Sequence, residues 1–504
     1  MNKINYSIHN DIKSDSIYDY LLLIHWISYN SAPELKLVPR ILNIFGRAKL
    51  PENVYIPTVF LTDYVQYLVK YINQLSGRSK TINWELEGAI LALDQFHKIN
   101  NLTGNKIPVE SFVYTMLQLY LDVKRDFRNY KKNNFNVLQF AYMLPASLKF
   151  KYLELESDRV SRTRFHYPRS LTIHRESLIS DSKNQLQKIK LSRKLRVEFA
   201  DEEGIDAGGI IREWSMQVTD YLAPFCFENN WISESADPTN MELLGTIFGL
   251  SLFNGTVLNT NLPAPFFKML LGLEITETDF EFLFPQQMRH LRQFQQSRNM
   301  DDFDEYFGCM TFCRNYSRTK STKNDDHSNC HALVKNGHSL YINKSNLEAY
   351  VDAYKQSLLY SMNNDAFKAF HKGFWKLLPC KKYVNNLFSC LELKSILQGD
   401  DKFDLTPLRD VCIFDYSLYP VKQVNSKYPL SKFIRDFWEI LLNDFSIEQK
   451  KKFLRFTTGC DRICQTRMCN IKEYDKRGFF FRVSISGTDS DHLPIAHTCI
   501  LLLT

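Results

Sequence analysis

Residues 195–214, LRVEFADEEGIDAGGIIREW, predict a strand, a glycine-containing turn and a helix in direct succession. Leu195, Val197 and Phe199 alternate with polar residues, as in a strand with one buried face. The glycines that follow permit a tight connection into the helical pattern that begins at Ile210. A phosphate-binding loop would also contain glycines, but the carboxylates of DEEGID would repel a phosphate, and no GKS or GKT follows. We therefore favour a structural turn.

Helical periodicity dominates the chain before this turn. Apolar residues recur at helical spacing in residues 62–75 and 86–99, which predicts a helical region over residues 1–106. This region could pack internally or bind a partner. In residues 107–127, one helical face would hold Phe112, Met116, Leu119, Tyr120 and Val123.

The second half of the chain mixes helices with short extended segments. Helices are expected at residues 346–362, 365–378 and 433–442, and Ser446 and Gln449 fit a capping box for the next one. The last of the three would place on one face Phe433, Phe437, Ile440 and Leu441. HALVKNGHSLYI, residues 331–342, predicts a hairpin with a type I′ turn at Asn336-Gly337. FFFRVSI, residues 479–485, predicts a half-buried strand.

Bulk properties exclude several classes of protein. The 504 residues are enough for roughly two to four domains. The net charge of +7 is spread over the chain without a basic block, so nucleic-acid binding is not expected. No apolar stretch approaches the about eighteen residues that span a bilayer, and the N-terminus lacks the plan of a signal peptide. Eleven cysteines in such a chain indicate a reducing compartment, which predicts a cytoplasmic or nuclear protein without membrane insertion.

The chain ends in LPIAHTCILLLT, and three interpretations of Cys499 compete. It could be a buried, inert thiol, since free cysteines often are. It could join a metal site with other cysteines, but no pair has the CxxC spacing typical of zinc sites, so we expect no metal. It could be a nucleophile, because a thiol is already partly ionised at neutral pH and needs little help to attack an activated acyl group such as a thioester.

Several motifs, in order, resemble the HECT-type ubiquitin ligases. LPIAHTC is similar to the family's LPxxHTC signature around its catalytic cysteine. LRVEFADEEGIDAGGIIREW, LLGTIFGLSLFNGTVLN, LPAPFFKMLLG, FKAFHKGF and FIRDFWEIL…FTTGCDR resemble further family segments. The resemblance covers roughly residues 107–504.

The resemblance implies an α+β, bilobal fold after the helical N-terminal region. A larger, mostly helical N-lobe would span residues 107–397, with a subdomain at about residues 275–350 that docks a ubiquitin-conjugating enzyme. A small mixed C-lobe would span residues 403–504. The polar, glycine-containing break between them supplies the hinge candidates Gln398, Gly399, Asp400, Asp401 and Lys402.

The resemblance also implies the chemistry. Cys499 would accept ubiquitin from the conjugating enzyme as a thioester and pass it to a lysine of a protein substrate, without a cofactor. His497 and Thr498 would shape the loop around the thioester, and Arg462 would hold a loop of the C-lobe, contact the donor complex or form a structural salt bridge. By position in the docking subdomain, the conjugating enzyme would contact Leu291, Phe294 and Tyr350, although aromatic residues at helical spacing are usually core.

One departure from the family pattern favours an alternative. Family members usually continue past the cysteine with a Phe-Asn pair and a tail, whereas Ile500-Leu501 follow here and the sequence stops at Thr504. The alternative is a truncated or catalytically impaired scaffold that binds the conjugating enzyme or ubiquitin without completing ligation.

Overall fold

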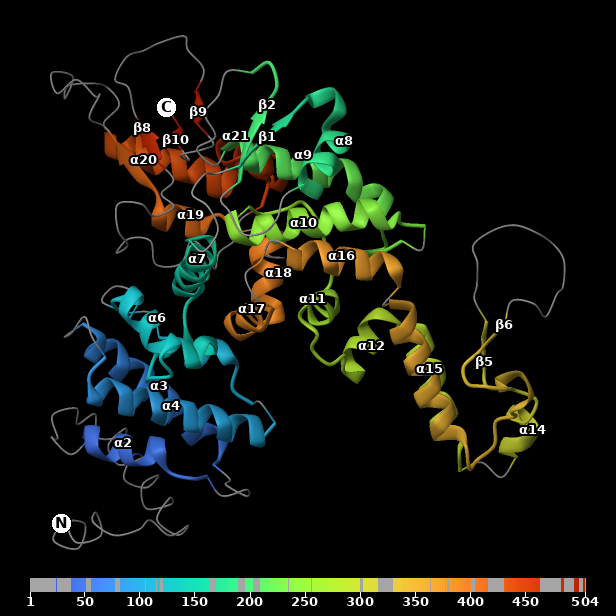
Figure 1. Ribbon diagram of the computed structural model, residues 1–504. Coiled ribbons are helices and arrows are strands. Elements are labelled where there is room, and N and C mark those ends of the chain that lie inside the picture. The colour runs from blue at the N-terminus through green and yellow to red at the C-terminus, as the bar shows by residue number, and fades with distance from the viewer. Residues whose placement is uncertain are drawn as a thin grey trace, which may run out of the picture. The chain divides into compact units, whose positions relative to one another are not determined.

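The computed structural model is mostly helical with a few short strands (Figure 1). It describes residue 24 and residues 38–50, 56–77, 82–104, 106–114, 116–117, 121–162, 169–188, 195–202, 209–233, 235–254, 256–299, 302–315, 330–362, 364–376, 378, 381–399, 404–415, 430–462, 482–484, 494–497 and 502–503. Two compact units are formed. The first contains Met1–Val218, Gly249–Thr260 and Leu377–Thr504, and the second contains Thr219–Phe248 and Asn261–Lys376.

The predicted N-terminal helices are confirmed within the first unit. They are α2 (Val38–Arg47), α3 (Thr58–Ser76) and α4 (Trp84–Leu102). The ring of Phe96 lies 5.0 Å from that of Phe45 and 5.3 Å from that of Tyr64, so aromatic packing joins the three helices. The side chain of Asn83 accepts a hydrogen bond from the Leu86 amide and fixes the start of α4.

The single helix predicted over residues 107–127 is wrong. The 3₁₀ helix η2 (Val109–Phe112) ends at Val113, which is extended, and α6 (Val123–Lys131) begins after Asp122. The Asp122 carboxylate accepts from the Arg125 amide, and this N-cap starts a new helix inside the apolar pattern. Two further elements follow, η3 (Val137–Met143) and α7 (Ala146–Arg162). Leu119 and Tyr120 lie outside the described residues.

The strand and helix predicted over residues 195–214 are confirmed at both ends. Strand β2 (Leu195–Phe199) pairs in parallel with β1 (Arg169–Ile173), and its three apolar residues are buried. Between the strands lie η4 (Arg175–Ser177) and α8 (Leu178–Lys188), and after them comes α9 (Gly209–Cys226). The buried indole of Trp214 donates to Ser182 Oγ at 2.9 Å, which ties α9 to α8. Residues 203–208, which contain most of the turn, lie outside the described residues.

In the second unit, helices pack through aromatic rings. The hairpin of β3 (Phe227–Glu228) and β4 (Trp231–Ile232) precedes α10 (Pro238–Asn254) and α11 (Ala264–Leu271). The ring of Phe370 on α16 (Asp365–Lys376) lies 5.0 Å from Phe248 and 5.1 Å from Phe266. The predicted helices at 346–362 and 365–378 are therefore confirmed, the first as α15 (Leu347–Met362).

The hairpin predicted at residues 331–342 is wrong. Three helices precede this region, namely α12 (Glu277–Leu283), α13 (Pro285–Ser297) and α14 (Phe303–Phe307). Between α14 and α15, strand β6 (Cys330–Ala332) pairs antiparallel with β5 (Cys313–Asn315). Asn336 does adopt the left-handed conformation expected for a turn, with φ of 62°. However, the chain then enters the 3₁₀ helix η6 (Gly337–Ser339) instead of a returning strand. The partner of β6 comes from earlier in the chain, so the local alternation was misleading.

The C-terminal part of the first unit is a small mixed module that follows α17 (Lys381–Leu387) and α18 (Cys390–Gln398). Its helices are α19 (Thr406–Val411), α20 (Leu430–Glu439), the π-helical turn η8 (Ile440–Asp444) and α21 (Ile447–Thr458). Its sheet has the order β7-β8-β10-β9, from β7 (Ile413–Asp415), β8 (Arg482–Ser484), β10 (Leu502–Leu503) and β9 (Ala496–His497).

Two details of this module were predicted. Ser446 and Gln449 form the expected capping box at the start of α21. The face of α20 is confirmed in part. Leu441 is buried and Phe433 and Phe437 are half-buried, but Ile440 is 45% exposed because the π-helical turn changes the register of the face.

Candidate active site and its supporting contacts

Ala496 and His497 of the terminal motif form β9, at one edge of the C-terminal sheet. Strand β9 pairs antiparallel with β10, with His497 opposite Leu502 and Ala496 opposite Leu503. In the sequence, residues 498–501 connect these two strands, and Cys499 is one of them. Thr498 and Cys499 lie outside the described residues, and of His497 only the backbone position in β9 is described.

The sheet edge is anchored by the core of the module. Leu405, Leu408, Trp438, Leu441, Leu454 and Val483 form a buried cluster, against which Ala496 packs. The two residues before Ala496, Pro494 and Ile495, are exposed. The chain therefore passes from an exposed segment into an anchored strand just before the cysteine.

A sharp corner follows α21 on the same module. Gly459 ends the helix with φ of 78°, a conformation that favours glycine, and its amide donates to the Arg455 carbonyl oxygen at 3.0 Å. The hydroxyl of Thr458 lies 2.8 Å from the Leu454 carbonyl oxygen and accepts from the Cys460 amide at 3.2 Å. These bonds set the direction in which Cys460 and Arg462 leave the helix.

Arg462 binds two backbone carbonyl oxygens from distant parts of the chain. Its Nη1 donates to Thr260 at 2.8 Å and to Gln398 at 3.1 Å. The Thr260 hydroxyl in turn donates to Gln398 Oε1 at 2.9 Å, and the Leu258 amide donates to the Leu397 carbonyl at 2.7 Å. These two bonds join the corner after α21 to two other segments, and the role of Arg462 in the reaction stays a prediction.

The predicted hinge begins where α18 ends. Gln398 is the last residue of the helix and is only 1% exposed, and Gly399 follows with φ of 75° and ψ of 177°, which only glycine adopts without strain. Asp400, Asp401 and Lys402 lie outside the described residues. Helix α18 thus ends at Gln398, the first of the residues predicted to form the hinge, and the hinge itself stays a prediction.

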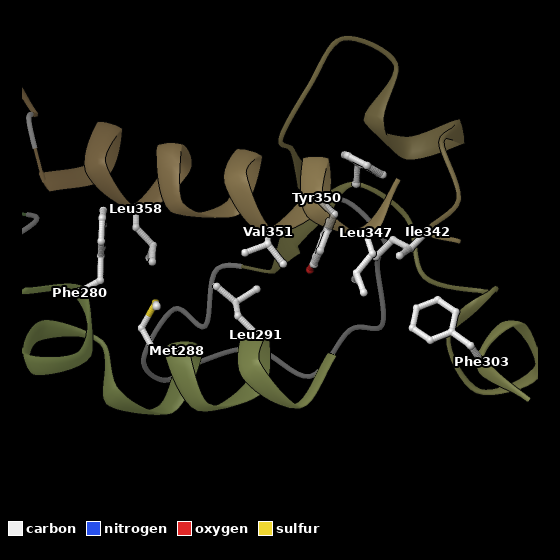
Figure 2. Packing of buried hydrophobic residues seen from close by; sticks show 10 residues of the cluster. Phe280, Met288, Leu291, Phe303, Ile342, Leu347, Tyr350, Val351 and Leu358 are labelled. Atoms are coloured by element: carbon white, nitrogen blue, oxygen red, sulfur yellow. The ribbon is translucent and has the colours of Figure 1, made fainter. Parts of the chain in front are cut away.

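The three residues predicted to touch a conjugating enzyme lie in a core. Leu291 and Tyr350 are 3% and 4% exposed, within a cluster that joins α12, α13 and α15. Figure 2 shows Val351 and Leu358 of α15 facing Leu291 and Met288 of α13. Phe294 is half-buried, with its ring 4.7 Å from that of Phe307 and 6.1 Å from that of Tyr350. As helical spacing of aromatic residues already indicated, these side chains stabilise the subdomain.

Exposed apolar residues lie beside this core. Met310, Leu340 and Tyr341 are 36%, 41% and 57% exposed. The Phe312 amide donates to the Leu340 carbonyl, and the Ile342 amide donates to the Met310 carbonyl, so the two segments lie side by side. We call Met310, Leu340 and Tyr341 the 310–341 patch. Sequence reasoning missed it because the predicted hairpin paired residues 338–342 with the wrong segment.

Among the residues that the structure describes, no three histidine, cysteine or acidic side chains come together in a way that could hold a metal ion. Cys460 is buried, and its Sγ lies 3.5 Å from the Val257 carbonyl oxygen. No helix in the described part of the chain is both long enough and apolar enough to cross a membrane.

Comparison with known proteins decides the family. A model of the HECT domain, described as a ubiquitin-transferase domain, matches residues 213–504, including the terminal motif. The chain belongs to the HECT-domain family. The match begins at residue 213, and the domain bounds expected from the sequence stay a prediction.

Named relatives of this HECT-domain chain extend the similarity upstream. The probable E3 ubiquitin-protein ligase mug30 of Schizosaccharomyces pombe is 26% identical over 83% of this chain and 55% of its own length. The probable ligase HERC4 of Rattus norvegicus is 25% identical over 84% of this chain and 42% of its own. The probable ligase HECTD2 of Mus musculus is 23% identical over 95% and 62%. The chain thus spans about half the length of the curated relatives that it matches.

Proposed function

We propose that the chain is a HECT-type ubiquitin-protein ligase that carries ubiquitin as a thioester on Cys499. The observation that carries the proposal is the match of the HECT ubiquitin-transferase domain through residue 504, which includes LPIAHTC. The relatives named as probable E3 ubiquitin-protein ligases support the same activity.

The reaction proceeds in two acyl transfers. The Cys499 thiolate attacks the thioester carbonyl of a ubiquitin-conjugating enzyme, and the conjugating enzyme's cysteine leaves as a thiolate. A lysine amine of a protein substrate then attacks the new thioester, an isopeptide bond forms, and Cys499 is released. Exchange between two thioesters is nearly balanced in free energy, so the protein contributes chiefly by positioning the groups.

Arg462 and its partners support the positioning role. The segments at residues 257–260, 397–399 and 460–462 are joined by hydrogen bonds, and residues 400–402 follow directly in the sequence. A single cysteine must face the conjugating enzyme first and the substrate second. A hinge next to a set of hydrogen bonds that holds one arrangement fits that requirement.

The 310–341 patch is our candidate surface for the conjugating enzyme. Residues 310–312 and 340–342 lie side by side, and along each segment side chains alternate between the two faces. Phe312 and Ile342 therefore enter the core, while Tyr341 projects outward. By the same alternation Met310 and Leu340 lie on the side of Phe312 and Ile342, where they remain partly exposed. Exposed apolar side chains beside a well-packed core are typical of a protein interface. Leu291, Phe294 and Tyr350 would contribute to docking by shaping this support.

A chase experiment separates a ligase from a binding scaffold. The chain would be charged with ubiquitin, the conjugating enzyme would be inactivated, and free lysine or a lysine-containing protein would be added. A ligase discharges, with loss of the thioester and growth of lysine-linked product at the same rate. A charged chain that loses ubiquitin only by hydrolysis, at the same rate with and without lysine, would contradict ligation and support the scaffold.

A further inference from the structure

A thiol and an imidazole meet in the subdomain that carries the 310–341 patch. Cys313 Sγ lies 3.2 Å from His338 Nδ1, with Cys313 at the start of β5 and His338 in η6. Backbone bonds set this approach, because the Leu333 amide donates to the Phe312 carbonyl at 2.8 Å and the Gly337 amide donates to the Val334 carbonyl at 2.9 Å. Cys313 is half-buried and His338 is exposed, so small molecules can reach the pair.

The pair can activate the thiol. The thiolate is the reactive form of a cysteine, and an imidazole Nδ1 at this distance can accept the thiol proton in the tautomer that carries its own hydrogen on Nε2. Cys412, Cys226 and Cys309 lie in different surroundings. Burial raises the pKa of Cys412 to about 12, and Cys226 is buried. Cys309 is exposed, but among the described residues it has no hydrogen-bond partner.

We propose that Cys313 is a modification site for soft carbon electrophiles of the α,β-unsaturated carbonyl class, with His338 as the base that receives its proton. In the addition, Cys313 Sγ forms a bond to the β-carbon of the electrophile while its proton moves to His338 Nδ1. The π electrons shift toward the carbonyl, and the resulting enolate takes a proton back from the imidazolium. No oxidant and no leaving group are required.

The adduct would lie next to the proposed docking surface. Residue 312, beside Cys313, donates through its amide to Leu340, and Leu340 and Tyr341 follow η6. A group added to Cys313 therefore occupies the space beside the 310–341 patch and hinders a docked conjugating enzyme. This effect rests on the proposed function, whereas the reactivity of Cys313 does not.

Acrylamide, a small unsaturated carbonyl compound, tests the reactivity. The full chain would be exposed to it for increasing times, and the adduct at each cysteine would be quantified by peptide mass spectrometry. Accessibility alone predicts faster addition at Cys309, which is the more exposed of the two. Activation by His338 predicts the reverse, with Cys313 reacting at least tenfold faster.

A substitution at the histidine isolates its role. His338→Asn should lower the rate at Cys313 to near that of Cys309 and leave Cys309 unchanged, with the same thermal unfolding midpoint as wild type. His338→Gln, whose side-chain oxygen can accept a hydrogen bond but not a proton, should behave in the same way. A Cys313 rate no greater than that of Cys309, or an unchanged rate in both folded variants, would overturn the proposal.

The effect on docking is measured by binding, so that Cys499 plays no part. Chains carrying Cys499→Ser would be treated with acrylamide, freed of excess reagent, and titrated with a conjugating enzyme whose own cysteine is already blocked. We expect at least a tenfold loss of affinity in the Cys313 adduct and none in identically treated Cys313→Ala. Equal affinity of adduct and untreated chain would overturn the docking effect. An untreated chain that binds no conjugating enzyme would overturn the docking surface itself, and the labelling result would still stand.

Discussion

Arg462 Nη1 donates to the carbonyl oxygen of Gln398 at 3.1 Å, which joins the corner after α21 to the residue that begins the predicted hinge. The same nitrogen bonds to Thr260, so one guanidinium connects three segments far apart in the sequence. A charged donor on two carbonyl oxygens contributes about 1.5–3 kcal/mol. Because the bonds end at the hinge, their loss should affect mobility more than overall folding.

We therefore predict that Arg462→Ala speeds hydrogen exchange at the amides of Leu258 and Gly399 by roughly tenfold or more, since about 1.4 kcal/mol of stabilisation corresponds to tenfold. It should also slow transfer of ubiquitin to Cys499. Arg462→Lys should lie between, because a lysine keeps the charge and loses the planar fork. The control is Arg435→Ala, since the Arg435 side chain is 68% exposed and pairs only with its neighbour Asp436 among the described acidic residues. Unchanged exchange in Arg462→Ala would contradict a holding role.

A buried ion pair predicts unequal effects of its two halves. Lys149 is 1% exposed, and its Nζ lies 2.6 Å from Glu392 Oε1, while Glu392 Oε2 accepts from the Ser389 amide to cap α18. Glu392→Gln keeps the cap but leaves a buried ammonium without its counter-charge, which should cost about 3 kcal/mol. Lys149→Met should cost less, because it removes the buried charge.

Urea unfolding checks this prediction. The double variant Glu392→Gln/Lys149→Met should be more stable than Glu392→Gln alone. Lys372→Met is the matched control, because Lys372 pairs with Glu242 at a 71% exposed position and should change the unfolding free energy by under about 0.5 kcal/mol. If the losses of unfolding free energy in Glu392→Gln and Lys149→Met simply add in the double variant, the two side chains do not stabilise each other and the prediction is wrong.

The buried cluster around Leu291 and the 310–341 patch beside it should respond differently to substitution. Leu340→Ala and Tyr341→Ala remove exposed apolar surface, so they should weaken binding of the conjugating enzyme about tenfold and leave the unfolding midpoint unchanged. Leu291→Ala should instead lower stability by about 2–5 kcal/mol. Tyr360→Ala is the control, since Tyr360 is 77% exposed on α15 and outside the patch. Calorimetric titration and thermal melts together distinguish the two groups, and undiminished binding by both patch variants would place docking elsewhere.

Asp126 predicts a pH dependence of stability. Burial raises the pKa of this carboxyl to about 6, although the Tyr152 hydroxyl and the Val137 amide donate to it. Because the folded pKa lies above the unfolded one, the folded state holds the proton more tightly between about pH 4 and 6. The contribution of Asp126 to stability is thus full below pH 4 and is lost as pH rises through 6. Relative to Asp126→Asn, the wild type should lose up to about 3 kcal/mol across this window. A constant difference between the two proteins from pH 4 to 7 would contradict the raised pKa.

The sequence predicted those features that are encoded locally. The capping box at Ser446 and Gln449 depends on residues three apart, and the alternation of Leu195, Val197 and Phe199 follows one strand. Where the outcome depended on a distant or competing partner, prediction failed. Asp122 interrupts the apolar pattern of residues 107–127 with an N-cap, and β6 pairs with β5 across residues 316–329. The partners of Arg462 lie at residues 260 and 398, which no spacing near Arg462 indicates.

Formation of a ubiquitin thioester on Cys499 tests the central claim most directly. The chain, activating enzyme, a panel of conjugating enzymes, ATP and ubiquitin would be mixed, and intact mass and non-reducing gels would be recorded with and without a thiol. The account predicts a thiol-sensitive adduct in the wild type, its loss in Cys499→Ala, and a thiol-resistant, hydroxylamine-sensitive ester in Cys499→Ser. A folded wild-type chain that forms no adduct with any conjugating enzyme, or an adduct that persists in Cys499→Ala, would contradict it.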